Sequence, residues 1–167
     1  MSALEIAAVA VSLLAMMSIL IGVLRCGISP MPSTRAAAEA VLSLAVPVKE
    51  GPIFELGSGW GGLAIRLARR HPERMIYGYE ISTIPYLFSV LAGRWSGQEN
   101  LKFHRQDFLR QDLSDASAVV CYLYPKGMEQ LAARLKDQSL VVVSNTFAMP
   151  GWEPDEVVRL GDRHRTQ

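Results

Sequence analysis

The chain has 167 residues, a formal net charge of +1 at pH 7, and hydrophobic side chains at half of its positions. This length allows one domain with its own core. Its scattered Lys and Arg residues argue against nucleic acid as the main partner, because phosphate binding needs a basic stripe. Two distant cysteines and three histidines without ligand spacing predict neither a disulfide framework nor a metal site.

The N-terminal segment is an uncharged apolar run over residues 6–24. As a helix it would reach about 28 Å, close to the hydrocarbon thickness of a bilayer. A secretory signal peptide is the alternative, but it needs a basic start, and the only charged residue before the run is Glu5. We therefore expect residues 1–29 to be a transmembrane anchor with a linker, and 30–167 to be the functional domain.

The orientation of this anchor follows from charges beside it. Arg25 and Arg35 come after the apolar run, and no Lys or Arg comes before it. The excess of positive charge on the cytoplasmic side of membrane proteins predicts that the domain faces the cytoplasm.

The rest of the chain alternates between strand and helix patterns. A helix from Ser33 or Thr34 to about Ala45 opens the domain. Short apolar runs predict strands, and stretches with apolar residues at helical spacing predict helices. The strands are expected at 52–56, 75–80, 101–107, 118–124 and 139–147, and the later helices at 61–70, 84–95 and 127–136. This alternation predicts an α/β fold, a Rossmann-like, mostly parallel sheet with helices on both faces.

Ligands of such sheets bind at the carboxyl ends of the strands. A glycine-rich stretch, FELGSGWGG at 54–62, follows the first expected strand. Glu80, Asp107 and Tyr124 come at the ends of later strands. We therefore expect these side chains and the glycine loop to meet at one edge of the sheet.

The glycine loop fits two kinds of cofactor. Gly57, Gly59 and Gly62 match the G-x-G-x-x-G pattern of dinucleotide sites, in which Glu80 would hold a ribose. Gly57, Gly59 and Gly61 match G-x-G-x-G instead.

Glu55, two residues before the first glycine, separates these alternatives. A carboxylate is unfavourable beside a doubly negative pyrophosphate and favourable beside a cationic ligand. An acidic residue followed by G-x-G-x-G resembles the first motif of class I S-adenosylmethionine-dependent methyltransferases, whose methyl donor carries a sulfonium and an ammonium.

The resemblance implies roles for further residues. Glu80 looks like the residue that binds both ribose hydroxyls. Asp107 resembles the acceptor for the adenine amino group, with Phe108 beside it. Tyr124 and Pro125 occupy the position that lines the methyl acceptor in this superfamily. No residue is assigned as a general base.

The whole chain resembles a narrower group, the membrane-anchored protein-lysine methyltransferases related to those that modify the c-subunit of ATP synthase. The similarity includes PSTRAAAEAVLSLA, GYEIS, VVCYLYPKGM and FAMPGWEPDEV. It implies S-adenosylmethionine as cofactor and a lysine of a membrane-associated protein as acceptor. Relatives usually carry Asp where this chain has Trp60, and they usually continue into a last strand. An NAD(P)-dependent oxidoreductase and a non-catalytic methyltransferase-like binding protein are the alternative functions.

Overall fold

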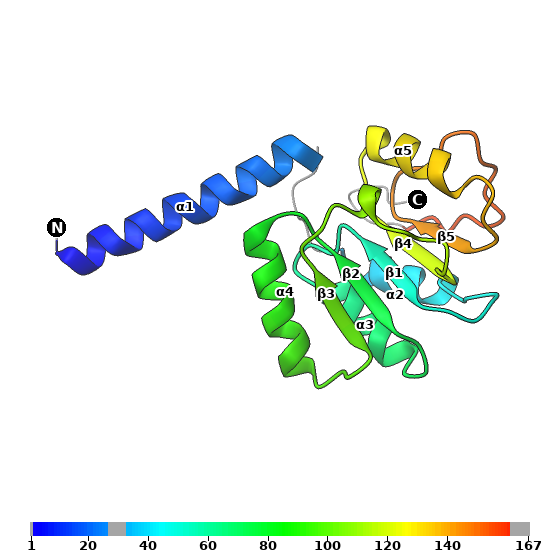
Figure 1. Ribbon diagram of the computed structural model, residues 1–167, viewed down its shortest axis with the longest axis horizontal. Helices are drawn as coiled ribbons and strands as arrows, with labels where there is room; N and C mark the ends of the chain where they lie inside the picture. Colours follow the sequence, from blue (N-terminus) through cyan, green and yellow to red (C-terminus); the bar gives the residue numbers. More distant parts are fainter. Residues whose placement is uncertain (1, 27–32, 161–167) are drawn as a thin grey trace.

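The computed structural model describes residues 2–26 and 33–160 (Figure 1). The elements are, in chain order, α1 (Ala3–Cys26), α2 (Arg35–Leu44), β1 (Ile53–Leu56), α3 (Gly62–Arg70), β2 (Ile76–Tyr79), α4 (Thr83–Ser96), β3 (Leu101–His104), the short 3-10 helix η1 (Phe108–Arg110), β4 (Ala118–Cys121), α5 (Pro125–Leu135) and β5 (Val141–Ser144). The five strands form one parallel sheet in the order β3-β2-β1-β4-β5. The predicted α/β fold with a parallel sheet is therefore confirmed.

The local sequence explains where the helices begin. The hydroxyl of Thr34 accepts a hydrogen bond from the backbone N–H of Ala37 and caps α2, as its sequence predicts. Pro125 stands in the first turn of α5, where its missing N–H has no helical partner to lose. Between β3 and β4, where no helix was predicted, the chain forms the short η1 and a loop.

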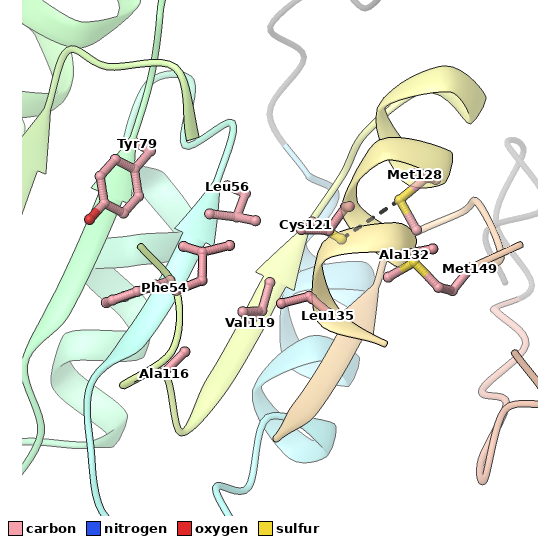
Figure 2. Packing of buried hydrophobic residues seen from close by; sticks show 12 residues of the cluster. Phe54, Leu56, Tyr79, Ala116, Val119, Cys121, Met128, Ala132, Leu135 and Met149 are labelled. Atoms are coloured by element: carbon pink, nitrogen blue, oxygen red, sulfur yellow. Dashed lines mark hydrogen bonds between the residues drawn. The ribbon is translucent and has the colours of Figure 1, made fainter. Parts of the chain in front are cut away.

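Two hydrophobic clusters cover the two faces of the sheet. On one face, α2 and α3 pack over β1, β2, β4 and β5, and α4 packs over β3. On the other face, Met128, Ala132 and Leu135 of α5 pack against Phe54, Val119 and Cys121 (Figure 2). Because both faces are covered, β1 and β4 are buried along their whole length.

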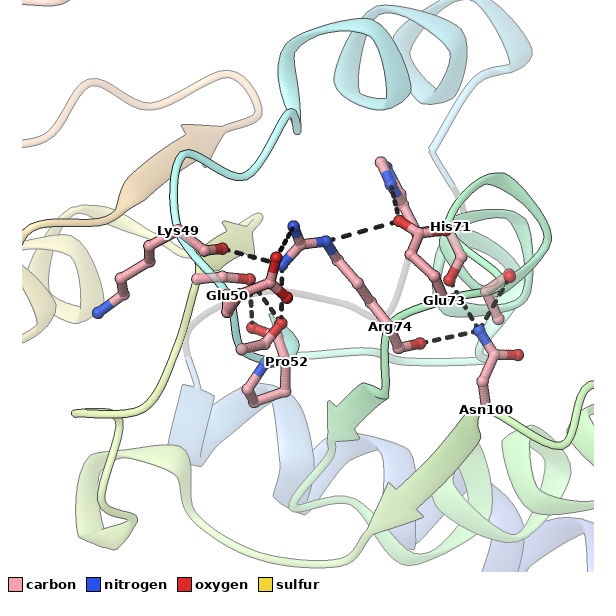
Figure 3. A network of polar contacts seen from close by, with 10 residues as sticks. Lys49, Glu50, Pro52, His71, Glu73, Arg74 and Asn100 are labelled. Carbon is pink, nitrogen blue, oxygen red and sulfur yellow. Dashed lines mark hydrogen bonds and ion pairs between the residues drawn. The ribbon is translucent and has the colours of Figure 1, made fainter.

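The amino ends of the strands are fastened by polar contacts (Figure 3). The Nδ2 of Asn100 lies within 3.0 Å of the carbonyl oxygens of Ala68, His71 and Arg74. The guanidinium of Arg74 donates to the carbonyl oxygens of Lys49 and Gly51, at 2.9 and 3.1 Å. These bonds join the loops at the edge of the sheet that lies opposite the carboxyl ends.

The N-terminal apolar run forms helix α1, which extends away from the sheet domain (Figure 1). Within the described residues, no helix has both the length and the apolar character needed to cross a bilayer. The structure thus does not support the membrane-spanning segment predicted for residues 6–24. Most of the predicted linker, and the last residues of the chain, lie outside the described residues.

Candidate functional site

A cavity of about 460 Å³ opens at the carboxyl ends of the strands, where the sequence predicts the site. Its volume lies in the range of pockets that hold small molecules. Of the nine residues predicted for the site, seven line this cavity: Glu55, Gly57, Gly59, Glu80, Asp107, Phe108 and Tyr124. The other two, Gly61 and Pro125, do not line it.

The glycine loop between β1 and α3 turns with left-handed backbone angles. Gly57 and Gly59 have φ angles of 80° and 53°, a region that side-chain-bearing residues rarely adopt. The backbone N–H groups of Gly57 and Ser58 both donate to the carbonyl oxygen of Tyr79, each at 2.9 Å. This anchoring brings the loop close to the end of β2 and leaves glycine backbone, without side chains, along the cavity.

Glu80 connects the glycine loop to the segment before α4. One carboxylate oxygen accepts the backbone N–H of Gly59 at 2.9 Å, and the other accepts that of Ser82 at 2.7 Å. The side chain is buried but lines the cavity. Each oxygen has a further lone pair, so the fixed carboxylate can accept two hydroxyl groups of a ligand.

Glu55 lines the cavity, and it forms no ion pair within residues 2–26 and 33–160. The residue is 6% exposed, and its Oε2 atom is buried without a hydrogen-bond partner. Burial raises the pKa of this carboxyl to about 8; the backbone N–H of Ala64 opposes that rise, and the negative charge of Glu80 adds to it. An orphaned acidic group of this kind fits a cationic ligand, which would return the carboxyl to its ionised form.

This burial makes a prediction about pH. The pKa of Glu55 rises from 4.5 in the unfolded chain to about 8 in the folded one, so its contribution to stability is complete below pH 4.5 and is lost as the pH rises to 8. The side chain of glutamine does not ionise, so Glu55→Gln does not lose stability at this position as the pH rises. We expect the stability gain of the variant, measured by urea unfolding without ligand, to be larger at pH 8 than at pH 5.5 by on the order of 3 kcal/mol.

Glu153→Gln is the matched control, because Glu153 is exposed. The difference in unfolding free energy between Glu153→Gln and the wild-type protein should be the same at pH 5.5 and at pH 8. A pH-independent difference between Glu55→Gln and the wild-type protein would contradict the burial argument.

Asp107 and Phe108 close the end of the cavity next to β3. The Oδ1 atom of Asp107 accepts the backbone N–H of Leu109 at 3.0 Å and thereby caps η1. Its Oδ2 atom lies 3.8 Å from the Nε of Arg110. Asp107 therefore holds the turn together and still presents a carboxylate to the cavity.

The opposite end of the cavity lies next to β4 and β5. Tyr122, Leu123 and Tyr124 follow β4, and Asn145 follows β5. Pro125 stands behind them in α5 and starts that helix instead of lining the cavity. This end is mainly aromatic and apolar, and its polar groups are neutral.

Sequence reasoning missed several residues of the cavity. The ring of Trp60 packs edge-on against Phe88 of α4, with ring centroids 5.4 Å apart, and both line the cavity. Tyr122 and Asn145 were also missed. For Asn145 a signal existed, because it directly follows the apolar run that forms β5, as Glu80 directly follows β2.

Comparison of the sequence with known proteins identifies similar families and relatives. The family model described as "ANTKMT methyltransferase domain" matches residues 55–156, from the end of β1 to the loop after β5. A protein-lysine N-methyltransferase of Saccharolobus islandicus (strain REY15A) is 24% identical over 138 residues, which are 79% of this chain and 84% of the relative.

Solved structures of methyltransferases are also similar to this chain. An RNA methyltransferase from Salinibacter ruber, in complex with S-adenosyl-L-homocysteine, has a TM-score of 0.70 and 30% identity, covering 78% of this chain and 87% of its own. The precorrin-6y C5,15-methyltransferase of Geobacter metallireducens GS-15 has a TM-score of 0.61 at 14% identity, with 71% and 65% covered, and shows the likeness of the fold alone.

Proposed function

The chain belongs to the ANTKMT methyltransferase domain family, and on that premise we propose that it methylates the side-chain amine of a lysine in a protein. It is a class I methyltransferase, and its cofactor is S-adenosylmethionine. The observation that carries the acceptor assignment is the neutral, aromatic end of the cavity beside β4 and β5. A lysine must lose its proton before it can attack, and an apolar surrounding lowers the pKa of an amine.

Under this proposal, one group of cavity residues binds the cofactor and a second group binds the acceptor. Glu80 holds the ribose hydroxyls, and Asp107 with Phe108 holds the adenine, at the end of the cavity near β2 and β3. Glu55 provides the negative charge for the cationic part of the cofactor. Its orphaned oxygen supports this role, because a cationic group of the ligand can supply the partner that the oxygen lacks. A pyrophosphate would keep this carboxyl protonated and supply no such partner, which disfavours NAD(P).

The acceptor is held by the residues next to β4 and β5. S-adenosylmethionine supplies a methyl group that is already activated by its sulfonium. The protein therefore has mainly to align the amine with that methyl group and to keep water out, and alignment alone can contribute several kcal/mol to the barrier. Tyr122, Leu123 and Tyr124 provide the walls that do this.

The sequence also predicts where the protein acts. We include in the proposal a membrane-associated acceptor and a cytoplasmic domain, which rest on the apolar run of residues 6–24 and on the charges after it. In the structure, α1 exposes apolar side chains such as Leu4, Val11 and Leu14, which favours an apolar partner for this helix.

RNA is the second candidate acceptor. It is favoured by the Salinibacter ruber structure, which is an RNA methyltransferase at 30% identity. The near-neutral charge of the chain disfavours it, because most RNA-binding surfaces are strongly basic.

A labelling experiment tests the proposal. The full chain is incubated with S-adenosylmethionine carrying a radioactive methyl group, together with separated protein and RNA fractions of the cell that produces it. We expect label in protein that releases N-methyl-lysines on acid hydrolysis, and none with Glu80→Ala. Label in nucleosides would instead support RNA as acceptor. Binding of S-adenosylmethionine without any transfer would favour the non-catalytic alternative.

A further inference from the structure

The backbone takes a strained turn directly after β5. Thr146 has a φ of 75°, and it is the only non-glycine residue with positive φ in the described part of the chain. The backbone N–H of Phe147 donates to the carbonyl oxygen of Asn145 at 3.0 Å, which closes a three-residue γ-turn around Thr146. This conformation is unfavourable for a β-branched residue and persists only where its surroundings enforce it.

The surroundings of this turn enforce it from several directions. The N–H of Asn145 donates to the carbonyl oxygen of Cys121 at 2.9 Å, so the pairing of β5 with β4 continues up to the turn. The hydroxyl of Ser144 donates to the carbonyl oxygen of Phe147. The ring of Phe147 stacks on Tyr122, with centroids 6.2 Å apart and an angle of 15° between the planes.

The result of the turn is a fixed amide in the cavity. Asn145 is 7% exposed and lines the cavity. The hydroxyl of Thr146 donates to its Oδ1 atom at 3.2 Å, which orients the amide group. Strained backbone often occurs at functional sites, where it positions a group that relaxed backbone would not.

The position of Asn145 in the sheet indicates which part of the reaction it serves. Cys121 and Ser144 are paired in β4 and β5, so Tyr122 and Asn145 follow at neighbouring positions of the carboxyl edge. Glu80 and Asp107 lie beyond β1, after β2 and β3. The cavity residues directly after β4, Tyr122, Leu123 and Tyr124, carry phenol and aliphatic groups, whereas Asn145 brings a buried side-chain carbonyl.

We propose that the side chain of Asn145, held by the γ-turn, orients the acceptor amine. This inference rests on the proposed function and adds a residue to it. The Oδ1 atom accepts one N–H of the neutral amine, which leaves the nitrogen lone pair directed at the methyl carbon. As the N–C bond forms, the C–S bond breaks, the positive charge passes from sulfur to nitrogen, and the product amine loses its extra proton to solvent.

An amide suits this task better than a carboxylate. A carboxylate at this position would stabilise the ammonium form of the lysine, which has no free lone pair. A neutral oxygen accepts a hydrogen bond and leaves the amine basicity nearly unchanged.

The test compares two ligands that differ at the reacting centre. S-adenosylhomocysteine has a neutral sulfur there, and sinefungin has a carbon that carries an amine in place of the methyl group. Calorimetry on the full chain measures the dissociation constants of both. We expect Asn145→Leu to leave S-adenosylhomocysteine binding within about twofold and to weaken sinefungin binding about tenfold or more, as loss of a hydrogen bond to a charged group predicts.

Two further variants make the result specific. Asn145→Asp keeps an acceptor oxygen and should retain sinefungin binding. Glu129→Leu changes an exposed residue of α5 that does not line the cavity, and both affinities should stay unchanged. Asn145→Ser replaces the leucine variant if the latter fails to fold, as judged by its thermal transition.

Other outcomes would overturn the proposal. An equal loss of both affinities would make Asn145 a cofactor-binding residue, and unchanged affinities would remove it from the site. If the wild-type protein binds neither ligand, the proposed function itself fails, which is a different result from these two.

Discussion

Replacing Glu80 by alanine is expected to weaken binding of S-adenosylhomocysteine by about 100-fold or more. The carboxylate is positioned by the N–H groups of Gly59 and Ser82 to accept two hydroxyl groups, and hydrogen bonds to a charged group are worth about 1.5–3 kcal/mol each. The variant also leaves the N–H of Gly59 without its acceptor, so the glycine loop loses one of its anchors. Calorimetry on the full chain measures the effect.

The control separates the loss of the ligand contact from loss of the fold. Glu129→Ala removes an exposed carboxylate from α5 and should leave the affinity unchanged. Glu80→Gln keeps the shape of the side chain and should fall between the wild-type protein and the alanine variant. If Glu80→Ala binds normally while its thermal transition is intact, the ribose role of Glu80 is wrong.

A large loss of stability is expected for Gly61→Ala. Gly61 precedes α3 with a φ of 81°, and an added Cβ would lie 2.7 Å from the Cζ of Phe103 and 2.8 Å from the Cβ of Ser89. The backbone strain costs roughly 1–2 kcal/mol, and the overpacking adds roughly 1–3 kcal/mol. We expect the free energy of unfolding to fall by about 3 kcal/mol in urea unfolding.

Two other glycines provide matched controls. Gly97→Ala has a similar φ of 68° but open space around it, so it should cost only the strain. Gly62 lies in α3, where an added Cβ would have no atom within 4 Å apart from its chain neighbours and the backbone of its own helix. Gly62→Ala should therefore be neutral or slightly stabilising. If Gly61→Ala were no worse than Gly97→Ala, the close packing of α3 against α4 and β3 would be wrong.

Gly61 also shows what a motif can and cannot predict. The pattern G-x-G-x-G treats its three glycines alike, and Gly57 and Gly59 do line the cavity. Gly61 instead faces Phe103 and Ser89, behind the loop. Glycine is needed there because a larger residue would not fit between these side chains. The spacing of a motif indicates which positions need glycine. The reason why a position needs it depends on neighbours that are distant in sequence.

The strands and the cofactor end of the site were predictable because their signals are local. Apolar runs predicted all five strands, and Glu80 and Asp107 were found because polar residues end such runs. The N-terminal apolar run forms the helix α1, but no helix of the described residues has the length and apolar character of the predicted membrane span. Asn145 was missed because the last strand was expected to run to residue 147, whereas β5 ends at Ser144 and the chain turns at Thr146.

The order of the strands has a consequence for how the protein behaves in concentrated solution. In the described ranges 2–26 and 33–160, no strand pairs with the outer side of β5, whose sequence is VVVS. An uncharged edge strand of consecutive valines offers free N–H and C=O groups to other chains. Self-association through this edge is therefore the expected route of precipitation on heating, and a lysine at partly buried Val142 is the substitution that should suppress it.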